Sequence, residues 1–108
     1  MNLPKFKVGS TVATPGAIAA LEVEGNDAMA NRILVSNEIQ KMLRRHICGD
    51  WGECCEEDKK TNDNAIAHEG TDEQQRVMSV YRTKDNVKIW CITEWDRSVT
   101  TFLLPSEY

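Results

Sequence analysis

The sequence lacks the signatures of several well-defined protein classes. No apolar run approaches the roughly 20 residues of a membrane span, and the opening segment MNLPKFKVGS lacks the apolar centre of a signal peptide. The patterns G-x-G-x-x-G, G-x-x-x-x-G-K-[ST], G-x-S-x-G and H-E-x-x-H are all missing. These absences predict a soluble, cytoplasmic chain. They disfavour nucleotide-dependent, serine-hydrolase and zincin chemistry.

Basic residues are outnumbered by acidic ones, 13 Lys and Arg against 17 Asp and Glu, for a net charge of −4. Direct nucleic-acid binding is disfavoured, because affinity for nucleic acid comes mainly from neutralising phosphates with Lys and Arg. The acidic excess is concentrated in residues 50–76, which carry nine acidic and three basic side chains. We therefore expect any electrostatic steering of a partner to start in this segment.

The four cysteines do not form the paired C-x2-4-C spacing of structural zinc sites. Cys48, Cys54 and Cys55 follow His46 in the pattern H-x-C-x5-C-C, and no second ligand pair exists elsewhere. A disulfide between adjacent Cys54 and Cys55 would be strained, and thiols of a cytoplasmic chain stay reduced. We predict mostly buried free thiols, with no metal and no cofactor.

The pattern of apolar and turn residues predicts a single α+β domain over residues 1–108, with N-terminal helices packed on a C-terminal three-stranded antiparallel meander. An extended segment, VGSTVAT, precedes a short helix that Thr14 caps and Pro15 begins. A longer helix, capped by Asn26 or Asp27, runs to about His46, either in one piece or interrupted at residues 36–37. A polar helix over residues 53–67 follows a tight connector.

The last third of the chain changes to a strand pattern. Residues 76–82, 87–94 and 99–104 are rich in β-branched and aromatic residues and are expected to pair as sequential neighbours. The turns fall at residues 85–86 and 95–98. Apolar side chains occupy both faces of the middle strand, so helices should cover one face and another structure part of the second.

His46 and Asp50 are the first candidate site. In an enzyme, Asp50 would orient His46 as a general base; in the structural alternative, His46 is a cation at a helix C-terminus and Asp50 closes a turn. The structural alternative is favoured, because Cys48 is the only nucleophile nearby. The enzyme hypothesis would make the chain a small metal-dependent hydrolase or nuclease using His46, Asp50, Glu94 and Asp96.

The turn with Glu94, Trp95, Asp96 and Arg97 is the second candidate. These side chains either contact a protein partner, with Trp95 as an anchor, or stabilise the turn itself. In the latter case Asp96 would cap backbone amides and Arg97 would pair with Glu94 or Asp50.

The third candidate is the acidic run that contains Glu56, Glu57 and Asp58, flanked by Glu53 and Asp63. It either imitates nucleic-acid phosphates and occupies a basic groove on a host protein, or it is a solvated helix face.

Several segments resemble a family of small bacterial proteins from plasmids, phages and integrated elements: VATPGAIAAL, LRRHICGDWGE, EEDKKTNDNAI and IWCITEWDRSVTTFLLPSEY. The motifs RH-x-x-GDWG and ITE-x-DRS-x-TT-x-LLP-x-EY carry the likeness, which covers residues 8–22 and 43–108. Members are called plasmid-related or uncharacterised proteins, and some are labelled as type I restriction subunits, although this length does not accommodate a methyltransferase. The sequence departs from the family in a longer stretch between Gly25 and Leu43 and in its Cys54-Cys55 pair.

The resemblance implies a setting on mobile DNA, where small acidic proteins often bind and modulate host enzymes. The combined hypothesis is a non-enzymatic module that binds a host protein or protein complex, of the anti-CRISPR or anti-restriction type. A homodimer formed through the second sheet face stays open as a further alternative.

Overall fold

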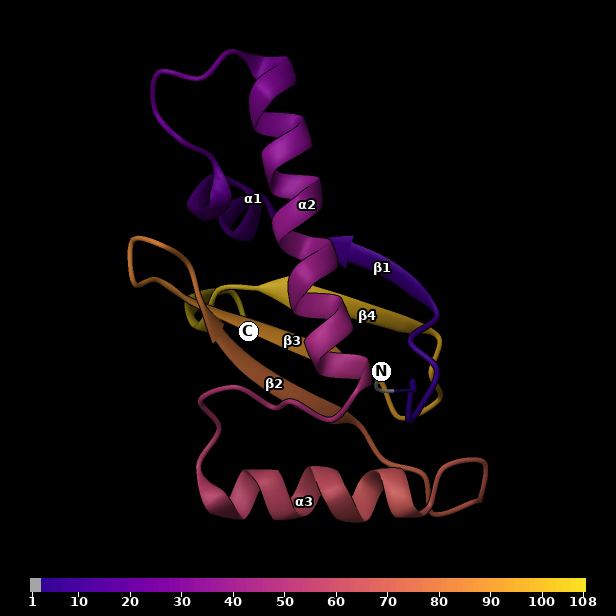
Figure 1. The fold of residues 1–108 in the computed structure, drawn as a ribbon. Coiled ribbons are helices and arrows are strands. Elements are labelled where there is room, and N and C mark those ends of the chain that lie inside the picture. The colour runs from indigo at the N-terminus through magenta and orange to yellow at the C-terminus, as the bar shows by residue number, and fades with distance from the viewer. Residues whose placement is uncertain (1–2) are drawn as a thin grey trace.

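The computed structural model describes residues 3–108 and has an α+β architecture (Figure 1). One sheet, with the strand order β1-β4-β3-β2, carries the helices on and beside one of its faces. The elements are β1 (Ser10–Ala13), α1 (Pro15–Leu21), α2 (Ala28–Ile47), α3 (Glu56–Ala67), β2 (Val77–Arg82), β3 (Lys88–Thr93), β4 (Val99–Leu103) and the 3₁₀ helix η1 (Pro105–Glu107). No helix within residues 3–108 has the length and apolar character needed to cross a bilayer.

The first two helices begin where their capping residues predict. The Thr14 hydroxyl accepts a hydrogen bond from the amide of Ala17 at 3.2 Å, and Pro15 opens α1. Asp27 caps α2 by accepting from the amide of Ala30 at 2.7 Å. These bonds satisfy amides that have no partner inside the helix. α2 is continuous over 20 residues, which resolves the alternative of a break at residues 36–37.

The sheet is mixed, which corrects the predicted three-stranded antiparallel meander. β2, β3 and β4 pair antiparallel as expected. β1 adds a fourth strand that runs parallel to β4. The expected order of helices first and sheet last is also wrong, because β1 precedes α1 and η1 follows β4. A parallel pairing between segments almost 90 residues apart leaves no mark in local periodicity, which explains the error.

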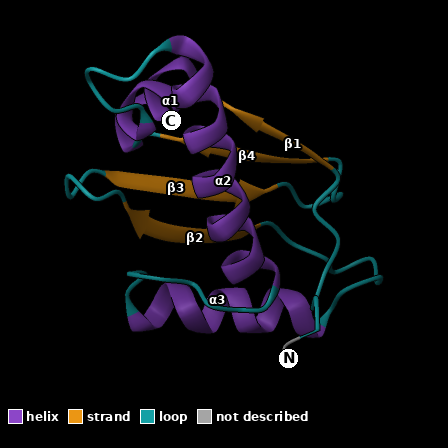
Figure 2. Cartoon of the chain, turned by 45° about the horizontal axis from the view of Figure 1, so that its top comes forward, coloured by secondary structure: helices purple, strands orange, loops and turns teal. Residues whose placement is uncertain are grey.

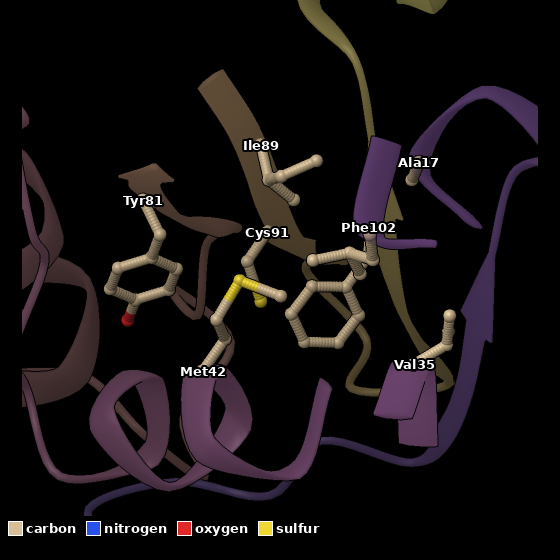
Figure 3. Packing of buried hydrophobic residues seen from close by; sticks show 8 residues of the cluster. Ala17, Val35, Met42, Tyr81, Ile89, Cys91 and Phe102 are labelled. Atoms are coloured by element: carbon tan, nitrogen blue, oxygen red, sulfur yellow. The ribbon is translucent and has the colours of Figure 1, made fainter. Parts of the chain in front are cut away.

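The main core lies between α2 and the face of the sheet that α2 crosses (Figure 2). Tyr81, Cys91 and Phe102 project from the strands toward Met42 and Val35 of α2 (Figure 3). Along β3, Ile89 and Cys91 share this face and Trp90 and Ile92 share the other, because side chains alternate along a strand.

The outer edge of β2 is closed by two neighbouring segments. Val80 donates its amide to the carbonyl of Trp51 at 3.1 Å, and its carbonyl accepts from the amide of Glu53 at 2.8 Å. The Asn62 carboxamide bonds both main-chain groups of Met78, donating to the carbonyl at 2.6 Å and accepting from the amide at 3.1 Å. A side-chain amide thus takes the place of one residue of a neighbouring strand.

Candidate functional site: the Trp95 turn and the acidic end of α3

The connection between β3 and β4, residues 94–98 and here called the Trp95 turn, presents an exposed aromatic residue. The Trp95 side chain is 64% exposed, whereas Trp51 is 4% exposed and packs in the core. Trp90 is half-buried and meets Tyr108 with ring centroids 5.5 Å apart. Of the three tryptophans, only Trp95 presents most of its surface to solvent.

Arg97 fixes the backbone of this turn. It has a positive φ of 61°, which residues other than glycine rarely adopt, and its side chain is buried at 7% exposure. The guanidinium forks onto the Glu69 carboxylate at 2.8–3.2 Å. It also donates to the carbonyls of Gln75 at 2.7 Å and Glu94 at 2.9 Å. Five contacts from one planar group lock the turn to the end of α3 and to the strand ends.

The predicted ion pair of Arg97 with Glu94 or Asp50 is wrong. Its ionic partner is Glu69, not the Glu94 or Asp50 carboxylate, and Glu94 contributes only its backbone carbonyl. A buried guanidinium that bonds Glu69 and the carbonyls of Gln75 and Glu94 supports the turn from inside. The side chains around it, Trp95 above all, are the exposed part of the turn.

Asp96 and Gln74 complete the turn. The Asp96 carboxylate accepts from the Ser98 amide at 3.0 Å and from the Ser98 hydroxyl at 2.6 Å, as the capping alternative predicts. These two hydrogen bonds to Ser98, the hydroxyl bond first, lower the pKa of Asp96. Gln74 donates to the Trp95 carbonyl at 2.7 Å. The peptide groups on both sides of the indole are therefore held in place.

The first turn of α3 carries the exposed carboxylates of Glu56, Glu57 and Asp58, where negative charge suits the helix dipole. Lys59 lies 3.6 Å from Glu56 and partly offsets its charge. α3 begins three residues later than expected, because residues 51–53 pair with the edge of β2. The flanking Asp63 accepts from the Trp51 indole at 2.9 Å and so has a structural partner.

His46 is fully buried and belongs to a polar network. Nδ1 bonds the Ser79 hydroxyl at 2.5 Å, and Nε2 bonds the Thr93 hydroxyl at 2.9 Å. Thr93 contacts Thr100 at 2.6 Å, and Thr100 donates to the Val8 carbonyl at 2.8 Å. Burial, with a smaller effect of the Arg97 charge, lowers the pKa of His46 to about 3. The imidazole is therefore neutral at pH 7, which corrects its expected role as a helix-end cation.

Asp50 does not orient His46 in the structure. The Asp50 carboxylate binds the Arg45 guanidinium at 2.7 Å, and this contact lowers the pKa of Asp50. Both imidazole nitrogens are engaged elsewhere, so His46 offers no free lone pair to a substrate. Within residues 3–108, no group of three or more His, Cys, Asp or Glu side chains is arranged to hold a metal ion. The geometry therefore gives no support to a hydrolytic centre of His46, Asp50, Glu94 and Asp96.

The cysteines do not form a cluster with His46 either. Cys54 and Cys91 are buried, Cys48 is half-buried and Cys55 is exposed. Burial raises the pKa of the thiols of Cys54 and Cys91, which makes them less reactive. Packing accounts for the two buried thiols.

Comparisons with protein-family models, with curated proteins and with solved structures found no match.

Two features of this region were not predicted from the sequence, for different reasons. The burial of His46 had a signal, because Val35, Ile39, Met42 and His46 recur at helical spacing along one face of α2. The pairing of Arg97 with Glu69 had none, because it depends on the end of α3 meeting the β3–β4 connection in space.

Proposed function

We propose that the chain is a non-enzymatic protein-binding module that docks through the Trp95 turn together with the acidic end of α3, which is its first turn with Glu56, Glu57 and Asp58. The observation that carries this proposal is the 64% exposure of Trp95 on a turn fixed by Arg97. A large aromatic side chain on a rigid support gains contact area on binding with little loss of backbone entropy. Residues that anchor protein interfaces are typically large aromatic side chains of this kind.

The chemistry of the surface indicates the kind of partner. An apolar pocket would receive the Trp95 indole, and basic groups would face Glu56, Glu57 and Asp58. The Trp95 turn contacts the C-terminal end of α3 through Arg97 and Glu69, whereas the three carboxylates lie at its N-terminal end. The 12 residues of the helix between them span about 18 Å. A standard interface of about 800 Å² per partner, roughly 30 Å across, therefore reaches both ends of the helix.

The resemblance to proteins of mobile elements suggests a host defence enzyme as the partner. A nuclease of an RNA-guided or restriction system carries a basic groove for nucleic acid. The carboxylates of α3 would occupy phosphate positions in that groove, in keeping with the net charge of −4. The module would then compete with nucleic acid for its binding site.

The test is affinity capture from host lysate at physiological salt, with tagged wild type, Trp95→Ala and Met29→Ala compared by mass spectrometry. Met29 in α2 is 65% exposed and serves as the matched control. We expect Trp95→Ala to reduce retention of a specific partner at least tenfold, as expected for a central anchor. Met29→Ala should retain that partner.

The acidic end of α3 is tested in the same format. Glu57→Lys should weaken capture and reduce its sensitivity to salt, whereas Glu24→Lys, an exposed acid in the connection between α1 and α2, should not. Unchanged capture by Trp95→Ala, or the absence of any partner for wild type, would contradict the proposal.

A further inference from the structure

The sheet has an open edge at β1, on the side of the molecule away from α3 (Figure 1). The amide of Ser10 donates to the Ser98 carbonyl at 3.1 Å, and the amide of Thr14 donates to the Phe102 carbonyl at 3.0 Å. Because main-chain groups alternate along a strand, Thr11 and Ala13 direct their N–H and C=O groups away from β4. No other segment within residues 3–108 pairs with them.

The two edges of the sheet differ in whether neighbouring segments pair with them. The β2 edge is closed by residues 51–53 and by the Asn62 carboxamide. β1 has the sequence STVA, is four residues long and carries neither charge nor proline, two of the devices that prevent an edge from pairing with another chain. Its Val12 side chain is 46% exposed. Because no described segment pairs with this uncharged edge, it is available to another strand.

The N-terminal half of α2 extends beyond β1 and covers the space beside it (Figures 1 and 2). A groove of about 490 Å³ lies there, lined by residues of β1, α1 and α2 that include Ile18 and Ile39. On the outer surface of the same half of α2, Met29 is 65% exposed and Ile33 is 56% exposed. A strand added to β1 would therefore meet apolar surface under the helix.

We propose that this edge is a self-association surface, at which β1 of a second copy pairs antiparallel with β1 about a two-fold axis at Val12. In this register Thr11 faces Ala13 of the other copy, and their outward groups form about four interchain hydrogen bonds. The two Val12 side chains are directly opposed. The joined sheet carries both α2 helices on one face, running in opposite directions, with Met29 and Ile33 available for contact between them.

The charge balance of the groove favours a second copy, and its small area indicates a weak association. The groove carries one acid, Glu22, and one base, Arg32, so two copies do not repel there despite a net charge of −4 each. Eleven residues line the groove. At about 30 Å² per interface residue they bury about 330 Å², roughly two fifths of the 800 Å² per partner found in stable dimers. The dimer is accordingly weak and forms only at high protein concentration.

Sedimentation equilibrium from about 10 µM to about 1 mM tests this proposal, which is independent of the proposed function. Wild type should shift from monomer mass toward twice that mass, and Val12→Lys should remain monomeric, because two ammonium groups would meet at the axis. Val23→Lys is the matched control, since Val23 is also 46% exposed but lies outside the groove. It should dimerise like wild type.

Hydrogen exchange at the two outward amides locates the contact. The amides of Thr11 and Ala13 should gain protection as concentration rises, and Val12→Lys should abolish the gain. Circular dichroism confirms that both lysine variants are folded. A monomer throughout the concentration range would overturn the proposal and leave the edge for a strand of another protein. A dimer that Val12→Lys does not weaken, or that leaves both amides unprotected, would also overturn it.

Discussion

At the scale of single residues, Arg97 shows how a strained backbone is maintained. A non-glycine residue at φ 61° costs on the order of 1 kcal/mol. The guanidinium offsets this cost by forking onto Glu69 and reaching the carbonyls of Gln75 and Glu94. The presentation of Trp95 therefore depends on a neighbour that is itself buried.

Arg97→Lys tests this role while keeping the charge and the backbone strain. One ammonium cannot replace the planar fork and reach both carbonyls as well. We expect the free energy of unfolding, measured by urea denaturation, to fall by about 2–3 kcal/mol. Arg82→Lys is the control, because Arg82 forms a more exposed pair with Glu53 at 2.8 Å and should lose less than about 1 kcal/mol. Equal losses of unfolding free energy in the two variants would show that the bonds from Arg97 to Glu69 stabilise the fold no more than an exposed ion pair does.

At the scale of elements, α3 is joined to the sheet mainly through the edge of β2. The apolar face of α3 is narrow, and Asn62, at 4% exposure, occupies its centre. Its carboxamide satisfies both free main-chain groups of Met78. One polar side chain thus attaches the helix and closes the strand edge at the same time.

Asn62→Ala should destabilise the fold by about 1–3 kcal/mol, because it leaves the Met78 amide without a partner and leaves the Met78 carbonyl with only the weaker Cys54 thiol donor at 3.3 Å. It should also accelerate hydrogen exchange at the Met78 amide. Asn64→Ala is the control on the same helix, since the Asn64 side chain is exposed, and it should change stability by less than about 0.5 kcal/mol. If both variants unfold at the wild-type urea concentration, Asn62 does not hold the edge.

At the scale of the whole molecule, the elements that local interactions determine could be predicted from the sequence. The strands β2, β3 and β4 fall within one residue of their predicted bounds, because alternating side chains and turn residues are local signals. The caps Thr14 and Asp27 are equally local. The parallel pairing of β1 with β4 was missed because it depends on how the finished helices and strands assemble.

The candidate site likewise contains features that could be predicted from the sequence and features that could not. Exposure of Trp95 was predictable, because a tryptophan in a polar turn has no neighbouring apolar pattern to pack against. The burial of the Arg97 side chain was not predictable, because charged residues are buried only where a partner that is distant in the sequence, such as Glu69, binds them. Polar residues whose partners lie far away in the chain are where prediction from a single sequence fails.

The His46 network links α2 to β2 and β3 and makes the stability of the whole fold sensitive to acid. In the folded state the pKa of His46 is lowered from 6.5 to about 3, mainly by burial. Below pH 6.5 the unfolded chain therefore binds a proton that the folded chain excludes, and stability falls as pH decreases toward 3. Between pH 6.5 and 4.5 the free energy of unfolding should fall by about 2–3 kcal/mol.

Urea denaturation at intervals across that range measures this slope. Most carboxylates remain ionised down to pH 4.5, so the slope there belongs mainly to the imidazole. His46→Gln, which can still bond Ser79 and Thr93, should be less stable at pH 7 but nearly independent of pH down to 4.5. His68→Gln, a change at the more exposed histidine after α3, should keep the wild-type slope. A wild-type slope in His46→Gln would show that acid sensitivity arises elsewhere and that the buried imidazole does not set it.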